Sequence, residues 1–75
     1  MIDVTDARGR KKHLAPGQWH VAAWRESRWE HVASVPEYGN AEKLARAGLR
    51  AGLSDKIALV FPSGHGDVPD RVEFV

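Results

Sequence analysis

Two short segments rich in aromatic and β-branched residues limit the possible folds of this chain more than any other feature. Residues 18–24 read QWHVAAW and residues 29–35 read WEHVASV, and the polar tetrapeptide RESR separates them. Aromatic and β-branched residues favour strands, and a short polar connection between two such segments is typical of a β-hairpin. The sequence therefore predicts a hairpin with a four-residue loop at residues 25–28.

The register of this hairpin decides which side chains share a face of the sheet, because side chains alternate between the two faces of a strand. Pairing Trp24 with Trp29 predicts four further facing pairs: Ala23 with Glu30, Ala22 with His31, Val21 with Val32, and His20 with Ala33. One face then carries both tryptophans together with His20, Ala22, His31 and Ala33. The other face carries Trp19, Val21, Ala23, Glu30, Val32 and Ser34.

Trp24 and Trp29 have two interpretations, and the sequence leaves both open. In the first, the rings pack under a helix whose small residues leave room for them. In the second, the face of Trp19 and Val21 forms the core, and the two rings lie on the opposite face, where an exposed aromatic patch marks an interaction site. Glu30 argues against a core on the Trp19 face unless it lies near the rim of the sheet, because a core disfavours an unpaired carboxylate.

The remaining segments predict one helix and further strands. Residues 2–6 alternate as in a short strand, and residues 11–15 can return as its hairpin partner after a turn at Gly9. Residues 41–52 place apolar or small residues on one helical stripe, with Asn40 as the expected N-cap and Gly52 as the residue that ends the helix. The members of that stripe are Leu44, Ala45, Gly48 and Leu49.

The C-terminal third contains one apolar strand and one alternating strand. Residues 56–62, KIALVFP, form a continuous apolar run of strand length, which fits a central strand. Residues 70–75, DRVEFV, alternate and fit an edge strand. We therefore predict a single α+β domain over residues 1–75, with a three- to five-stranded, mainly antiparallel sheet and one helix packed on one face.

Residues capable of catalysis or metal binding are few. Ser63, His65 and Asp67 are the residue types of acyl transfer, but a catalytic triad depends on geometry and these types are also common in loops. His20 and His31 are diagonal neighbours in the expected register, whereas a zinc site needs three or four ligands. The chain has no cysteine. We expect no enzymatic activity, no cofactor and no metal site.

The expected function is binding of a protein partner through the sheet. Tryptophan and arginine dominate the energetics of protein interfaces. The expected contact residues are therefore those of the hairpin, namely Trp24, Arg25, Arg28, Trp29 and His31. The alternative is a nucleic-acid-binding module, in which cations contact phosphates and rings stack on bases. Its basic residues are Arg8, Arg10, Lys11 and Lys12.

Charge and composition suggest the setting of the protein. A net charge of +1 favours neither kind of partner, and no apolar run is long enough to span a membrane. The absence of disulfides favours the cytoplasm, or that of a host cell. Small size and a composition rich in Ala, Arg and Gly suit an accessory protein of a phage or mobile element, such as an anti-CRISPR inhibitor of a host system. A homodimer through residues 70–75 or through the open sheet face is a third expectation.

Overall fold

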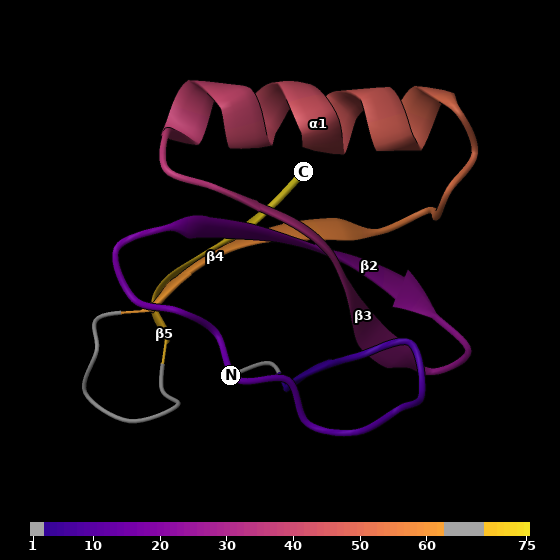
Figure 1. Ribbon diagram of the computed structural model, residues 1–75. Coiled ribbons are helices and arrows are strands. Elements are labelled where there is room, and N and C mark those ends of the chain that lie inside the picture. Colours follow the sequence, from indigo (N-terminus) through magenta and orange to yellow (C-terminus); the bar gives the residue numbers. More distant parts are fainter. Residues whose placement is uncertain (1–2, 63–68) are drawn as a thin grey trace.

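The chain folds into a five-stranded sheet with one helix across one of its faces (Figure 1). The computed structural model describes residues 3–62 and 69–75. In chain order the elements are β1 (Val4–Thr5), β2 (Trp19–Arg25), β3 (Arg28–Val35), α1 (Tyr38–Arg50), β4 (Ile57–Pro62) and β5 (Pro69–Phe74). Figure 1 shows the segment that follows β1 on the side of the sheet opposite α1. The predicted fold class is confirmed.

The sheet is mixed but mostly antiparallel, and its strands lie in the order β1-β3-β2-β4-β5. β2 is antiparallel to both of its neighbours, β3 and β4, and β5 is antiparallel to β4. β3 and β4 therefore run in the same direction on either side of β2, and α1 connects them. Only β1 pairs in parallel, with β3.

The turn of the β2–β3 hairpin is tighter than the sequence suggested. Arg25 pairs with Arg28, so the loop contains two residues rather than the predicted four. Those residues, Glu26 and Ser27, have φ angles of 52° and 65°. Two consecutive positive φ angles are the geometry of a type I′ turn, whose twist matches that of the strands it joins. Neither residue is the glycine or asparagine usual in such turns, which is why the sequence did not indicate this turn type.

A β-bulge in β3 makes two of the five predicted pairs wrong. The pairs Trp24–Trp29, Ala23–Glu30 and Ala22–His31 are confirmed. Beyond them the predicted partners of Val21 and His20 are wrong, because these residues pair with Ala33 and Ser34. Val32 is the extra residue of the bulge and is exposed. Its insertion shifts all the following residues of β3 by one position relative to β2.

Helix α1 starts earlier than predicted but ends where expected. It begins at Tyr38 with Glu37 as the N-cap, and no side chain caps its first turn, so the expected cap at Asn40 is wrong. At the other end, Gly52 has a φ angle of 77°. The amides of Gly52 and Leu53 donate to the carbonyls of Leu49 and Gly48 at 3.2 and 2.9 Å, which is a Schellman motif.

The buried stripe of α1 consists of smaller residues than predicted. Ala41 and Ala45 are buried, and Leu49 packs against them, whereas Leu44 is 44% exposed and does not belong to the stripe. A Cβ atom at Gly48 would lie 3.0 Å from Cδ1 of Ile57. These small residues let the helix lie close to the sheet.

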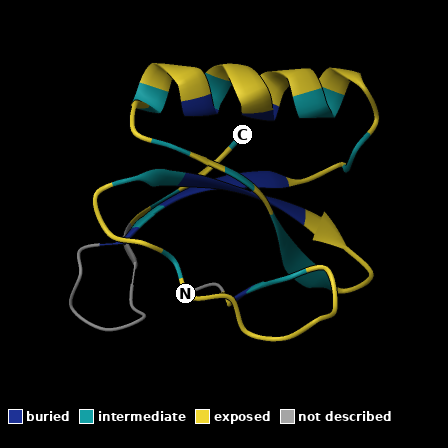
Figure 2. Cartoon of the chain, in the orientation of Figure 1, coloured by how far each residue is buried: buried dark blue, intermediate teal, exposed yellow. Residues whose placement is uncertain are grey.

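The core consists of two layers, one on each face of the sheet (Figure 2). Between α1 and the sheet lie Val21, Ala23, Ala41, Ala45, Ile57 and Leu59. On the opposite face Val4, Ala22, Ala58 and Val60 are buried, with Leu14 and Trp29 packed against them. β4 contributes alternate residues to both layers, which explains its continuous apolar sequence and confirms that it is a central strand.

The N-terminal segment forms a turn rather than a full hairpin. A single antiparallel bridge joins Thr5 to Lys11, so the second predicted strand is reduced to one residue. The Asp6 carboxylate accepts hydrogen bonds from the amides of Arg8 and Arg10 at 2.8 and 3.0 Å. The bond from Arg10, followed by that from Arg8, holds the pKa of Asp6 below its ordinary value.

Candidate interaction face

The two tryptophans of the hairpin lie on the face of the sheet opposite the helix. Trp19, Val21 and Ala23 belong to the layer beneath α1, and β-strand alternation directs Trp24 to the other side. Trp29 faces Trp24 across the hairpin and packs on the second layer. The rings therefore do not pack under the helix but lie on the opposite face of the sheet.

Glu30 shares the helix side of the sheet, but it lies next to the hairpin end rather than in the middle. Its carboxylate lies 3.7 Å from Nη1 of Arg25 and is partly exposed to solvent. This ion pair and the position near the rim remove the objection that an unpaired carboxylate would be buried.

Three aromatic rings form a continuous group on the open face, which we call the aromatic face: Trp24, Trp29 and Phe74. The ring centroids of Trp24 and Trp29 lie 5.3 Å apart in an edge-to-face arrangement, and those of Trp29 and Phe74 lie 5.8 Å apart. Trp24 is 38% exposed and Phe74 is 64% exposed. The group reaches from β3 to β5, across the buried alanines of β2 and β4.

Phe74 was not among the residues predicted from the sequence. It joins the group because it pairs with Ala58, which in turn pairs with Ala22. Two alanines in this row leave space above the sheet, and Trp29 packs against them. The alternation of residues 70–75 indicated that Phe74 shares a face with Val72, but only the pairing of β4 with both β2 and β5 shows which face that is.

Polar groups border the aromatic face just before the start of β4. The ammonium nitrogen of Lys56 lies 5.9 Å from the centroid of the Trp24 ring, within the range of a cation–π interaction. The Ser54 hydroxyl donates to the carbonyl of Trp24, and the amide of Trp24 donates to the carbonyl of Lys56 at 2.9 Å. These bonds hold the strand carrying Trp24 against the loop that precedes β4.

His20 and His31 lie on the same side of the sheet and are in direct contact. His20 Nδ1 and His31 Nε2 are 3.1 Å apart, and His20 Nε2 lies 2.9 Å from the carbonyl oxygen of Ala15. Because a carbonyl can only accept, His20 donates through Nε2, and in its neutral form accepts at Nδ1 from His31. Burial, followed by the charges of His20 and Lys12, lowers the pKa of His31.

The two arginines of the predicted site lie at the end of the hairpin, beyond its tryptophans. Arg25 and Arg28 face each other one residue beyond the tryptophan pair. Arg25 lies beside Glu30 on the helix side, whereas the guanidinium of Arg28 reaches the N-terminal turn. Arg28 Nη2 lies 3.7 Å from the Glu26 carboxylate and 3.5 Å from the carbonyl oxygen of Ala7. Of the five predicted contact residues, Trp24, Trp29 and His31 therefore lie on the open side.

The basic residues of the alternative site lie on the N-terminal turn beside β3. Arg8, Arg10, Lys11 and Lys12 are all exposed. The turn is fixed to β3 by the pairing of β1 and by a hydrogen bond of 2.9 Å from the Thr5 hydroxyl to the carbonyl of Trp29. The charge of Lys12 reaches His31, so at least this cation lies near the open side of the sheet.

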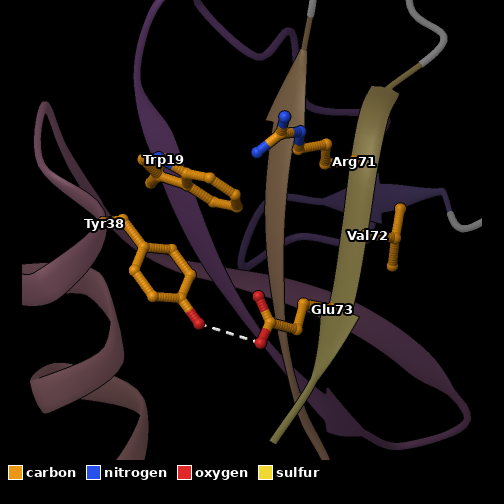
Figure 3. A pocket seen from close by; sticks show the side chains of 5 residues that line it. All are labelled: Trp19, Tyr38, Arg71, Val72 and Glu73. Carbon is orange, nitrogen blue, oxygen red and sulfur yellow. Dashed lines mark hydrogen bonds between the residues drawn. The ribbon is translucent and has the colours of Figure 1, made fainter.

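A shallow groove of about 660 Å³ lies on the other side, between the start of α1 and β5 (Figure 3). Trp19, Tyr38, Arg71, Val72 and Glu73 line it. The Tyr38 hydroxyl donates to Glu73 at 2.8 Å, and this hydrogen bond is the main cause that raises the pKa of Tyr38 to about 12. The rings of Trp19 and Tyr38 meet edge to face at 4.9 Å.

Other candidate sites are few in the part of the chain that the structure describes. Ser63, His65 and Asp67 lie outside the described residues. Within residues 3–62 and 69–75, no three His, Asp or Glu side chains are grouped so as to hold a metal ion. No helix in these ranges is long and apolar enough to cross a membrane. In comparisons with known proteins, no family model, curated protein or solved structure matches the chain.

Proposed function

We propose that this chain is a small, non-enzymatic protein-binding module that presents its aromatic face to a partner. The observation that carries the proposal is the group of Trp24, Trp29 and Phe74, whose rings adjoin one another across the sheet while two of them remain accessible. Adjoining exposed aromatic rings on a small domain are typical of interaction sites, and tryptophan is the residue most enriched among those that dominate binding energy.

The rings of the aromatic face are held in place by their neighbours, which favours binding to a partner surface of defined shape. Trp29 packs on the buried layer that includes Ala22 and Ala58, and its contacts with Trp24 and Phe74 restrict all three rings. Side chains already ordered in the free protein lose little conformational entropy on binding. Lys56 at the border supplies a charge that a partner carboxylate can meet.

Site-specific photo-cross-linking tests the proposal. A photoreactive amino acid replaces Trp24 in one variant and Leu44 in a control variant, because the two side chains are similarly exposed, at 38% and 44%, on opposite sides of the molecule. We expect a discrete cross-linked product with a protein of the source cell from position 24 and not from position 44. Equal labelling at both positions, or none at position 24, contradicts the proposal.

A binding measurement with the captured partner then shows whether the rings supply affinity. We expect the Trp24→Ser and Trp29→Ser double variant to bind at least about tenfold more weakly, as a loss of about 1.4 kcal/mol or more at such residues implies. The control is Leu44→Ser, which removes a comparably exposed apolar side chain from α1. Whether the partner belongs to a host system, as an inhibitor from a phage or mobile element would require, follows from its identity.

A nucleic-acid-binding function is the second candidate, favoured by the cations beside the rings. Lys56 lies over Trp24, and the charge of Lys12 reaches His31 on the same side of the sheet. Cations next to accessible rings are the arrangement that binds single strands. This candidate predicts binding of a single-stranded oligonucleotide that weakens steeply with salt, and further weakening in an Arg10→Glu, Lys12→Glu variant. Absence of salt-dependent binding excludes it.

A further inference from the structure

β5 leaves one of its edges unpaired in the described part of the chain. It pairs with β4 on one side and ends the sheet on the other. The sheet's opposite end is β1, which has only two residues, whereas β5 has six. The free edge of a strand this long presents a row of backbone donors and acceptors that another strand can pair with.

The hydrogen bonds to β4 identify which backbone groups of β5 face outward. The amide of Val75 donates to the carbonyl of Ile57 at 2.9 Å, and Glu73 pairs with Leu59 in the same register. In an antiparallel ladder, alternate residues direct both their N–H and C=O groups to the same neighbour. Residues 71, 73 and 75 therefore bond to β4, and residues 72 and 74 point their backbone groups to the free edge, whereas a bulge at residue 70 interrupts the alternation there.

The side chains around Val72 carry opposite charges on one face. Figure 3 shows Arg71 and Glu73 projecting to the helix side of β5 and Val72 projecting to the other side. Arg71 makes no ion pair or hydrogen bond with any described residue. Glu73 accepts from Tyr38 through Oε1, which leaves its second oxygen for another donor.

We propose that two copies of this chain associate through β5 in an antiparallel pair whose twofold axis passes through Val72. In this register Arg71 of each copy faces Glu73 of the other, which forms two symmetric ion pairs. The two Val72 residues exchange their outward N–H and C=O groups, and the outward groups of Phe74 lie beside the bulge at residue 70 of the other copy. The sheets of the two copies join into a continuous sheet with both helices on one side.

The charges of Arg71 and Glu73 favour this register over those whose twofold axis passes through a neighbouring residue. A twofold axis through residue 71 sets Arg71 opposite its own copy, and an axis through residue 73 does the same for Glu73, so that like charges meet directly. An axis through residue 70 sets Arg71 opposite Pro69, which leaves it without a facing carboxylate. With the axis at Val72, the charged residues also occupy the pairs without mutual backbone bonds, where facing side chains lie closest.

The dimer has a consequence for the rest of the molecule. Because a twofold axis perpendicular to the sheet keeps each face on its own side, the aromatic faces of the two copies lie on the same side of the joined sheet. Two equivalent faces engage a symmetric or repeated partner at once, which raises the overall affinity without new contacts. The dimer itself does not depend on the proposed function.

Charge reversal tests both the association and its register. In sedimentation experiments over a range of concentrations, we expect the wild type to dimerise and Arg71→Glu and Glu73→Arg each to weaken its dimer about tenfold or more. Mixed together, these two variants should form a heterodimer, because each faces the opposite charges of the other. Lys43→Glu on the exposed side of α1 is the charge-matched control and should dimerise as the wild type does.

Cross-linking through single cysteines locates the axis, since the natural chain contains no cysteine. Val72→Cys places two thiols directly opposite each other, with Cα atoms about 5.5 Å apart as in a hydrogen-bonded antiparallel pair, which a disulfide can bridge. Phe74→Cys places its thiol opposite residue 70 of the other copy. On mild oxidation of dilute protein, we expect a covalent dimer from Val72→Cys and monomer from Phe74→Cys.

Three results would overturn the proposal. The first is a wild-type chain that remains monomeric at every concentration reached. The second is a dimer indifferent to charge reversal at Arg71 and Glu73, which would place its interface elsewhere. The third is efficient cross-linking through Phe74→Cys but not through Val72→Cys, which would move the axis. Circular dichroism of each variant shows whether its monomer is folded, so that a failure of association is not confused with unfolding.

Discussion

At the scale of single residues, the hairpin turn is the most unfavourable local conformation in the described chain. Glu26 and Ser27 both occupy the left-handed region, which side chains with a Cβ atom avoid. The ion pair of Glu26 with Arg28 is exposed and contributes little in return. Because Arg25 pairs with Arg28, only Glu26 and Ser27 remain to form the turn.

Replacing the turn by its preferred sequence should stabilise the protein. We expect the Glu26→Asn, Ser27→Gly variant to raise the free energy of unfolding by about 1 kcal/mol, because both new residues adopt positive φ angles readily. Chemical denaturation of the variant and the wild type measures the difference. Glu26→Val is the matched control and should lower stability, because a β-branched residue fits this conformation poorly. A stabilising effect of valine would contradict the turn geometry.

The partial burial of His31, together with the nearby His20, makes stability depend on pH. The pKa of His31 is lower in the folded protein than its ordinary value of 6.5, mainly because of burial. The unfolded chain therefore binds a proton more readily, and the stability that neutral His31 provides is present above pH 6.5 and lost as pH falls through the folded-state pKa. We expect His31→Gln to flatten this part of the curve of melting temperature against pH. Parallel curves for the two proteins would contradict this prediction.

At the scale of elements, the sequence indicated the strands better than their exact pairing. The aromatic and β-branched residues of β2 and β3 and the apolar run of β4 are strong local signals, and all three strands are present. The bulge at Val32 carries no such signal, because a valine fits a regular strand as well as a bulge. The partners of Val21 and His20 could therefore not be predicted.

The helix illustrates a second limit of sequence analysis. Ala45 and Leu49 of the predicted apolar stripe face the sheet, but Leu44 is exposed although it matched the periodicity, and Ala41 is buried in addition. Periodicity places a residue on a helix but does not fix the rotation of that helix against a sheet. Similarly, a helix starting at Tyr38 includes Asn40 in its first turn and leaves it no capping role.

Substitution of two leucines tests this orientation of α1. We expect Leu44→Ala to change the free energy of unfolding by no more than about 0.5 kcal/mol, as at other exposed positions. Leu59→Ala removes a fully buried side chain from the layer beneath α1 and should cost about 2–5 kcal/mol. Chemical denaturation distinguishes the two. A large loss from Leu44→Ala would mean that the helix is rotated relative to the structure described here.

At the scale of the whole molecule, the two faces of the sheet are covered in different ways. α1 covers one face, whereas the other is covered by the N-terminal segment around Val4 and Leu14 and by the ring of Trp29. Trp24 and Phe74 remain accessible because no described element extends over them. The sequence identified Trp24 and Trp29 as a pair but did not show on which face of the sheet they lie. Only the packing of α1 on Trp19 and its neighbours decides which face that is.

Iodide quenching of tryptophan fluorescence, combined with thermal melting, tests the exposed aromatic face most directly. Trp24 is partly exposed, whereas Trp19 lies between the rings of Tyr38 and Phe61 at 4.9 and 5.0 Å. We expect Trp24→Phe to lose most of the quenchable fluorescence with little change in melting temperature. Trp19→Phe should retain the quenchable fluorescence but melt at a lower temperature. If Trp24→Phe instead retained the quenching and lost stability, Trp24 would be a core residue and the proposed binding face would be wrong.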